Sequence, residues 1–230
     1  MIKSEIIEKL KNYAEFIPVC PEVEIALGIP RRPVKIVVKS GDRYLVQPAY
    51  NKDVTFNMIE FTNSFLDNIG PVDGFILKSK SPSCGIGDVK YYSKAEASPV
   101  VAKGNGLFGD EVKTRFSNLA IEDEARLQNP RLKEHFLTKL FTLTSFRELE
   151  VKGNIKALMD FHANNKYLLM AYNQNEMRTL GKIIGTQKER AFEDEYSDYK
   201  SHLQSALAKG LNISHTLTSF ITLLDMSQRN

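Results

Sequence analysis

The 230 residues of the chain are 42% hydrophobic and 26% charged, close to the averages of soluble globular proteins, which excludes a disordered, collagen-like or coiled-coil chain. The 31 basic and 28 acidic residues give a net charge of +3, so the overall balance does not indicate a nucleic-acid-binding protein. At about 150 residues per domain, this length allows one large domain or two modest ones.

The first predicted element is an amphipathic helix over residues 4–14, with Ser4 as its N-cap and apolar residues at helical spacing. No apolar run approaches the ~20 residues that span a bilayer, and the N-terminus lacks the apolar core of a signal peptide. We therefore expect a cytoplasmic protein with no membrane contact. In that reducing compartment the two cysteines, Cys20 and Cys84, are expected to be free thiols or ligands and not a disulfide.

The next segment, residues 16–21, contains two prolines, which forbid a helix and predict an extended path that ends near Cys20. A β-hairpin is predicted over 34–38 and 43–47, around a turn that contains glycine. Five cations against one acid occupy residues 31–43. Two interpretations stay open for them: contacts to phosphates, or solvated charges that protect a strand edge.

A helix that begins at Asp53 or Thr55 and ends before Gly70-Pro71 is followed by a short apolar strand over 74–77 and a Ser- and Gly-rich loop over 78–87. This order is typical of an open α/β sheet, whose sites lie beyond the carboxyl ends of the strands. Cys84 lies in that loop and therefore at a position where sites occur.

Helical periodicity dominates the second half, and no strand is expected after about Gly104. We predict a Rossmann-like open-sheet α/β domain over 1–118 and an all-α domain over 119–230. The helices are expected at 132–146, 155–161, 167–184, 190–207 and 213–224.

Each cysteine lies beside a proline in an irregular segment, in Cys20-Pro21 and in the string 81–85. Thiolates are soft ligands that suit iron-sulfur clusters or zinc, whereas a free cysteine is more often a small buried hydrophobic residue. The separation of 64 residues between Cys20 and Cys84 contains no CxxC pair, which makes zinc the weaker interpretation.

Four strings, residues 20–25, 27–33, 73–78 and 81–85, resemble in their order and separation the thiouracil desulfidase family of bacteria and archaea. That family is related to the tRNA 4-thiouridine desulfidases, in which the same domain is fused to a helical domain. The second half is similar to that partner domain in its strings 106–108, 122–127 and 161–167.

The resemblance implies a 4Fe-4S cluster held by three cysteines, with one open iron that acts as a Lewis acid on a thiocarbonyl. It also implies Cys20 and Cys84 as ligands, Glu22 as general acid or base, and Ser81 as a polar group that orients the substrate. We also expect three further residues to bind the substrate, which are Arg31, Lys78 and Ser83.

From the residues alone, an exposed loop carboxylate is the favoured interpretation of Glu22, and the alternative for Ser81 is a turn-forming serine before proline. The expected substrate is a thiolated nucleobase or a tRNA, with no recognition of a DNA sequence.

The chain departs from the family pattern in its thiols, because Cys20 and Cys84 are its only two cysteines and no Cys-Leu-Leu-Gly segment is present. The sheet is therefore expected to be incomplete at its N-terminus, and the closing segment of the helical domain to be missing. A fragment, a third ligand from elsewhere, and a cluster-less relative that binds RNA or a partner are the open interpretations, of which we favour the fragment.

Overall fold

The computed structural model describes residues 4–185 and 191–211. The chain divides into two compact units, each described here by itself. The first unit comprises Met1–Ser117 and Ile121–Lys133, and the second comprises Asn118–Ala120 and Glu134–Asn230.

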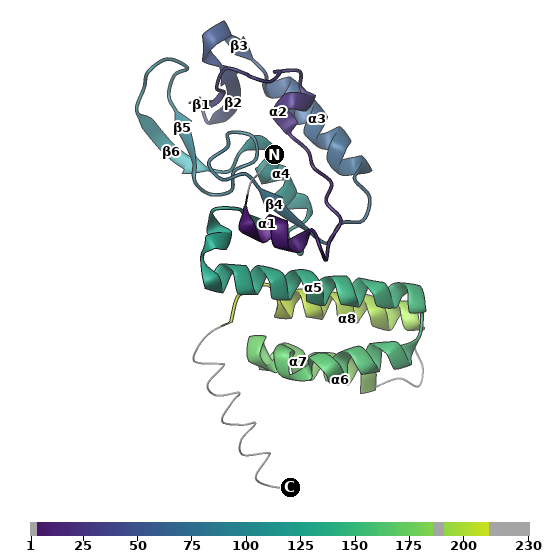
Figure 1. The fold of residues 1–230 in the computed structure, drawn as a ribbon. Coiled ribbons are helices and arrows are strands. Elements are labelled where there is room, and N and C mark those ends of the chain that lie inside the picture. The colour runs from purple at the N-terminus through teal and green to yellow at the C-terminus, as the bar shows by residue number, and fades with distance from the viewer. Residues whose placement is uncertain (1–3, 186–190, 212–230) are drawn as a thin grey trace. The chain divides into compact units, whose positions relative to one another are not determined.

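The first unit combines short strands with four helices and two 3-10 turns (Figure 1). In chain order the elements are α1 (Glu5–Leu10), α2 (Pro21–Glu24), β1 (Lys35–Lys39), β2 (Asp42–Gln47), η1 (Pro48–Tyr50), β3 (Lys52–Asp53), α3 (Thr55–Asn68), β4 (Gly74–Leu77), β5 (Val89–Tyr92), β6 (Val100–Gly104), α4 (Leu107–Arg115), β7 (Ala120–Asp123) and η2 (Arg126–Gln128).

Five strands form a mixed sheet in the order β3-β2-β1-β5-β6, and β4 pairs with β7 in a separate two-stranded sheet. Within the larger sheet β1 and β5 run parallel, whereas the other neighbours are antiparallel. The predicted α/β class and the predicted hairpin are both confirmed. Ser40 and Gly41 have φ of +53° and +93° between the paired ends Lys39 and Asp42, the left-handed geometry that a two-residue hairpin turn requires.

One hydrophobic core joins the sheet to α3 and α4. Ile36 of β1 and Tyr91 of β5 meet Met58 of α3 and Phe108 of α4 in this cluster. Apolar residues recur at helical spacing along α3, which places one stripe of that helix against the sheet. The core therefore lies on one face of the sheet, the face that α3 and α4 cover.

Two expectations for the first unit are wrong. Pro21 does not prevent a helix but begins α2, since a proline at the first helical position loses no intrahelical hydrogen bond, and Cys20 becomes the N-cap residue. A strand also follows Gly104, because Ala120–Asp123 pairs as β7 with β4. Half of that strand is acidic, so its composition carries no strand signal. Strands β5 and β6 were likewise not predicted.

The second unit is helical, as predicted. Its helices are α5 (Pro130–Lys152), which begins in the last residues of the first unit, α6 (Ile155–Tyr172), α7 (Gln174–Gly185) and α8 (Phe192–Ala206). The break expected between the helices over 155–161 and 167–184 does not occur there. Helix α6 continues through it to Tyr172, and the chain divides into α6 and α7 at Asn173. The helix expected over 213–224 lies outside the described residues.

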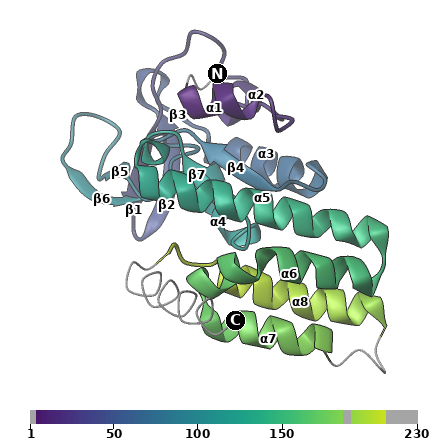
Figure 2. The same cartoon turned by 60° about the horizontal axis from the view of Figure 1, so that its bottom comes forward.

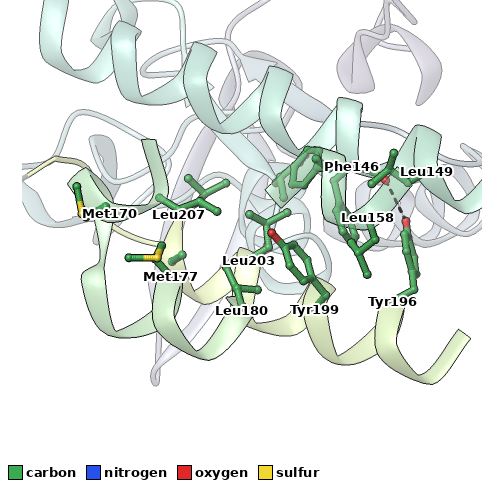
Figure 3. Packing of buried hydrophobic residues seen from close by; sticks show 14 residues of the cluster. Phe146, Leu149, Leu158, Met170, Met177, Leu180, Tyr196, Tyr199, Leu203 and Leu207 are labelled. Atoms are coloured by element: carbon green, nitrogen blue, oxygen red, sulfur yellow. Dashed lines mark hydrogen bonds between the residues drawn. The ribbon is translucent and has the colours of Figure 1, made fainter. Parts of the chain in front are cut away.

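Helices α6, α7 and α8 lie side by side (Figure 2), and aromatic rings pack with leucine and methionine side chains in the core of the unit (Figure 3). Phe146 stacks on Tyr196 at 4.6 Å and on Tyr199 at 5.4 Å between ring centroids. The Tyr199 hydroxyl lies 3.0 Å from Nδ1 of the buried His162. In the part of the chain that the structure describes, no helix is both long and apolar enough to cross a bilayer.

Candidate functional site

Two segments about sixty residues apart in the sequence meet at the carboxylate of Glu22. The first is the opening turn of α2, which carries Glu22 two residues after Cys20. The second is the loop after β4, from which Ser83 Oγ donates a hydrogen bond of 2.9 Å to Glu22 Oε1. Ser81 Oγ lies 3.5 Å from the same oxygen. The structure therefore gathers both predicted catalytic residues and one predicted substrate-binding residue in one cluster.

Arg31 holds the other side of the same carboxylate. Its Nε donates to Glu22 Oε2 at 2.6 Å, and its Nη2 lies 3.6 Å from Cys20 Sγ. The side chain of Glu22 is 12% exposed and that of Arg31 is 27% exposed. Charge-assisted hydrogen bonds in such a half-buried setting fix direction more firmly than surface pairs do. Glu22 is therefore a fixed group and not the mobile surface carboxylate that its loop position suggests.

The hydroxyl of Ser81 also shapes the loop. Its Oγ accepts hydrogen bonds from the backbone N–H groups of Ser83 at 3.3 Å and Cys84 at 3.2 Å, while the Gly85 N–H donates to the Ser81 carbonyl at 2.8 Å. These bonds close a tight turn after Pro82. The turn-forming interpretation and the contact to Glu22 thus both apply to Ser81.

The N-terminus of α4 packs directly on the backbone of this loop. The Gly109 N–H donates to the Ser83 carbonyl at 3.0 Å, and the Gly106 N–H donates to the Gly85 carbonyl at 2.8 Å. A Cβ at Gly106 would lie 2.4 Å from the Ser83 carbonyl oxygen, and one at Gly109 would lie 2.6 Å from that of Cys84. Only glycine allows this approach. Sequence reasoning missed both residues for the site, although their spacing of three at the start of a helix was a signal.

Both cysteines are free thiols and only partly accessible. Burial raises the pKa of the Cys84 thiol to about 12, and the nearby Glu22 carboxylate and Cys20 act in the same direction. Cys84 is therefore a neutral thiol near pH 7. It becomes a thiolate only when a positive charge, such as a soft metal centre, compensates the buried negative charge.

Lys78, the remaining predicted substrate-binding residue, forms an ion pair with Glu124. The same carboxylate accepts hydrogen bonds from the N–H of Ser79 at 2.7 Å and from its Oγ at 3.0 Å. Burial opposes ionisation of Glu124, but the bonds from Lys78 and Ser79 outweigh it and lower the pKa of the carboxyl. Lys78 thus anchors the start of the loop to the segment after β7.

The donor set around the thiols is incomplete for a metal. Among the described residues, no group of three or more His, Cys, Asp or Glu side chains is arranged to hold a metal ion. The third candidate donor, Glu22, is already engaged on both oxygens. Cys20 and Cys84, which are the only cysteines of the sequence, therefore supply two soft donors and no more.

Comparisons with known proteins match two parts of the chain to described families. Residues 1–124 match the model of a family described as 2-thiouracil desulfurase, and residues 166–228 match a family described only as a protein of unknown function. Among solved structures, the chain is similar to the [4Fe-4S]-dependent thiouracil desulfidase TudS, at 26% sequence identity and a TM-score of 0.41. That match covers 57% of this chain and 81% of the other. No curated protein matches.

Proposed function

The chain belongs to the 2-thiouracil desulfurase family, and from this premise we propose that it replaces the sulfur of a thiolated pyrimidine with oxygen. Water adds to the thiocarbonyl carbon, the carbon–sulfur bond breaks, and the sulfur leaves as sulfide, so the exchange needs no oxidant or reductant. The observation that carries the proposal is that Ser83 and Arg31 hold the carboxylate of Glu22, while the same Arg31 lies 3.6 Å from the thiol of Cys20.

Glu22 is the proton-transfer group of this proposal. A carboxylate fixed beside a bound substrate accepts a proton from the attacking water and returns it to the departing sulfur or to the ring. Ser83 and Arg31 hold its two oxygens in place, so the carboxylate does not reorganise during the reaction. Ser81 lies at the same oxygen and offers a hydroxyl to the polar edge of the pyrimidine.

The two thiols give the site its affinity for soft atoms. The family resemblance implies a 4Fe-4S cluster on three cysteine thiolates, and that ligand set does not fit a chain with Cys20 and Cys84 alone. Cys20 and Cys84 are two of the three ligands that such a cluster needs. The proton transfers proposed for Glu22 do not depend on how the sulfur is held.

The proposed substrate is a thiolated pyrimidine within an RNA, such as 4-thiouridine in tRNA. The supporting observation is the helical second unit, since the tRNA 4-thiouridine desulfidases that the sequence resembles also join a helical domain to the α/β domain. Two free thiols suit the reducing cytoplasm.

The test is turnover of 2-thiouracil, 4-thiouridine and tRNA that carries 4-thiouridine by the full chain, after anaerobic incubation with iron and sulfide salts. Sulfide release and the oxo-pyrimidine product are both measured. We expect Glu22→Gln to lower turnover by roughly 10²- to 10⁴-fold. The matched control is Glu24→Gln on the exposed side of the same helix. A wild type that converts none of the three substrates contradicts the proposal, and so does a Glu22→Gln variant with full activity.

A further inference from the structure

A row of three lysines crosses the five-stranded sheet from its central strand β1 to its edge strand β6. Lys90 on β5 pairs directly with Lys103 on β6. Because Ile36 pairs with Tyr91 in the parallel register of β1 and β5, Lys35 lies beside Lys90, one residue earlier on each strand. Neighbouring strands lie about 4.8 Å apart. The three lysines therefore cross three adjacent strands within about 10 Å.

The row lies on the face of the sheet opposite the core. Ile36 and Tyr91 point into the core with α3 and α4, and alternate residues of a strand point to opposite faces. Lys35 and Lys90, which precede them, therefore point to the other face. Lys90 and Lys103 are exposed, and Lys39 extends the same face as a further exposed cation at the end of β1.

These lysines differ from seven other cations of the first unit, each of which forms an ion pair. Arg31, Arg43 and Arg115 each have a carboxylate partner. The other cations of this unit that form ion pairs are Lys9, Lys11, Lys78 and Arg126. Within residues 4–185 and 191–211, no ion pair involves the lysines of the row. Like charges directly opposite each other destabilise a sheet. On this face Asp42 lies opposite Lys39, but Lys90 and Lys103 face each other as like charges with no ion-pair partner among the described residues, at a cost to the fold.

Protection of a sheet edge does not explain the row. Lysines on edge strands prevent association with other sheets, and Lys103 lies on the edge strand β6. Lys90, however, is on the inner strand β5, and Lys35 is on β1 at the centre of the sheet. A charge pattern that reaches the centre of the face requires another reason.

Tyrosine rings lie among the lysines on this face. The Lys35 ammonium lies 5.1 Å from the centroid of the Tyr92 ring. In register, Tyr44 and Tyr92 lie on either side of Val37, and both rings are partly exposed. Cations that follow a phosphate backbone beside aromatic rings on which bases stack are the pattern of single-stranded nucleic-acid binding. Neither an acidic peptide nor a lipid headgroup uses the rings in this way.

Two lysines of the row follow residues of the candidate site closely in the sequence. Lys35 follows Arg31 by four residues, and Lys90 follows Cys84 by six. Even fully extended, these segments span at most about 14 Å and about 21 Å between Cα atoms. An RNA strand held on the sheet therefore runs within a few nucleotides of Glu22.

We propose that this sheet face binds the phosphate backbone of the RNA that presents the thiolated base, with Lys90 and Lys103 as its main phosphate contacts. The inference rests on the proposed function for the identity of the bound RNA. In this proposal the α/β unit itself takes part in RNA binding.

The experiment measures binding of a fluorescently labelled tRNA transcript without sulfur to the full chain, by anisotropy at several salt concentrations. The double variant Lys90→Glu/Lys103→Glu is compared with Lys52→Glu/Lys113→Glu, which changes two other exposed lysines and the net charge equally. We expect the first variant to weaken binding tenfold or more. Its slope of log affinity against log salt should fall by about 1.4, since each single-strand phosphate contact contributes about 0.7. The control should stay within about threefold of the wild type.

A third variant separates binding from stability. Lys103→Glu alone places opposite charges across the β5–β6 pair, so it should raise Tm slightly while it weakens binding. Equal losses in both double variants, or no binding by the wild type, overturn the proposal. Wild-type binding to phosphatidylglycerol vesicles but not to tRNA also overturns it, in favour of a membrane surface. The transcript carries no sulfur, so its binding does not depend on desulfuration. If the chain binds it through Lys90 and Lys103 but desulfurates none of the three substrates, the proposed function is contradicted and the RNA-binding face is not.

Discussion

The two units hold their functional and structural groups in place by different means. In the first unit, Glu22 is fixed by hydrogen bonds from Ser83 and Arg31, and the loop beneath it depends on backbone contacts at two glycines. In the second unit, stacked rings around Phe146 fill the space between helices. The site thus depends on a few directed contacts, whereas the helical unit depends on filled volume. Substitutions should therefore act differently in the two units.

The largest effect on stability is expected in the helical core. Phe146→Ala removes a ring that is 2% exposed and should lower the free energy of unfolding by about 3 to 5 kcal/mol, because the surrounding rings cannot close the cavity. Urea denaturation followed by circular dichroism measures this loss. Phe141→Ala on the same helix is the control, since that ring is 42% exposed. Similar losses in the two variants would contradict a unit stabilised by packed volume.

The next effect is expected where α4 meets the loop. Gly109→Ala brings a Cβ to 2.6 Å from the Cys84 carbonyl oxygen, and the backbone must move, at a cost of about 1 to 3 kcal/mol. Turnover should fall with stability, because the moved loop carries Ser83. Gly185→Ala, which meets no atom within 4 Å, should leave both unchanged or slightly raise Tm. A Gly109→Ala variant with wild-type Tm and turnover would show that the close approach is not needed.

A smaller effect should appear in turnover more than in stability when Arg31 is changed. Arg31→Met leaves Glu22 with hydrogen bonds on one oxygen only, and turnover should fall about tenfold, equivalent to about 1.4 kcal/mol. The control is Arg32→Met, at an exposed neighbour. Steady-state kinetics at saturating thiolated substrate measure the difference. Equal rates for the two variants would remove the positioning role of Arg31.

The smallest effect concerns the pair of Lys78 and Glu124, and it depends on pH. The pKa of Glu124 lies below its ordinary value of 4.5 in the folded chain, so the pair stabilises the fold above about pH 4.5, and this contribution is lost as pH falls through the lower folded-state value. Because Lys78 is half exposed, Lys78→Met should cost only about 0.5 to 1 kcal/mol at pH 7.

Urea midpoints measured from pH 7 down to pH 3 test this sign. The difference between Lys78→Met and wild type should shrink toward acid, whereas Lys80→Met on the same loop should show little difference at any pH. A difference that grows toward acid would contradict the assigned direction of the Glu124 pKa.

Local patterns in the sequence predicted much of the first unit. The hairpin over 34–47 was predicted because Ser40 and Gly41 suit its turn, and the α3 helix because its apolar residues recur at helical spacing. Strand β7 was missed, since its stability comes from pairing with β4 and not from its own composition.

The sequence by itself determined the α/β class, the helical second half and the residue types available for chemistry, because periodicity, turn chemistry and the count of two cysteines are local properties. Only the tertiary structure decided that Glu22 is fixed on both oxygens and that Gly106 and Gly109 admit α4 to the loop. It alone placed Lys35, Lys90 and Lys103 in one row. The physical reason is that register and close backbone approach join residues far apart in the chain, and no local pattern encodes those distances.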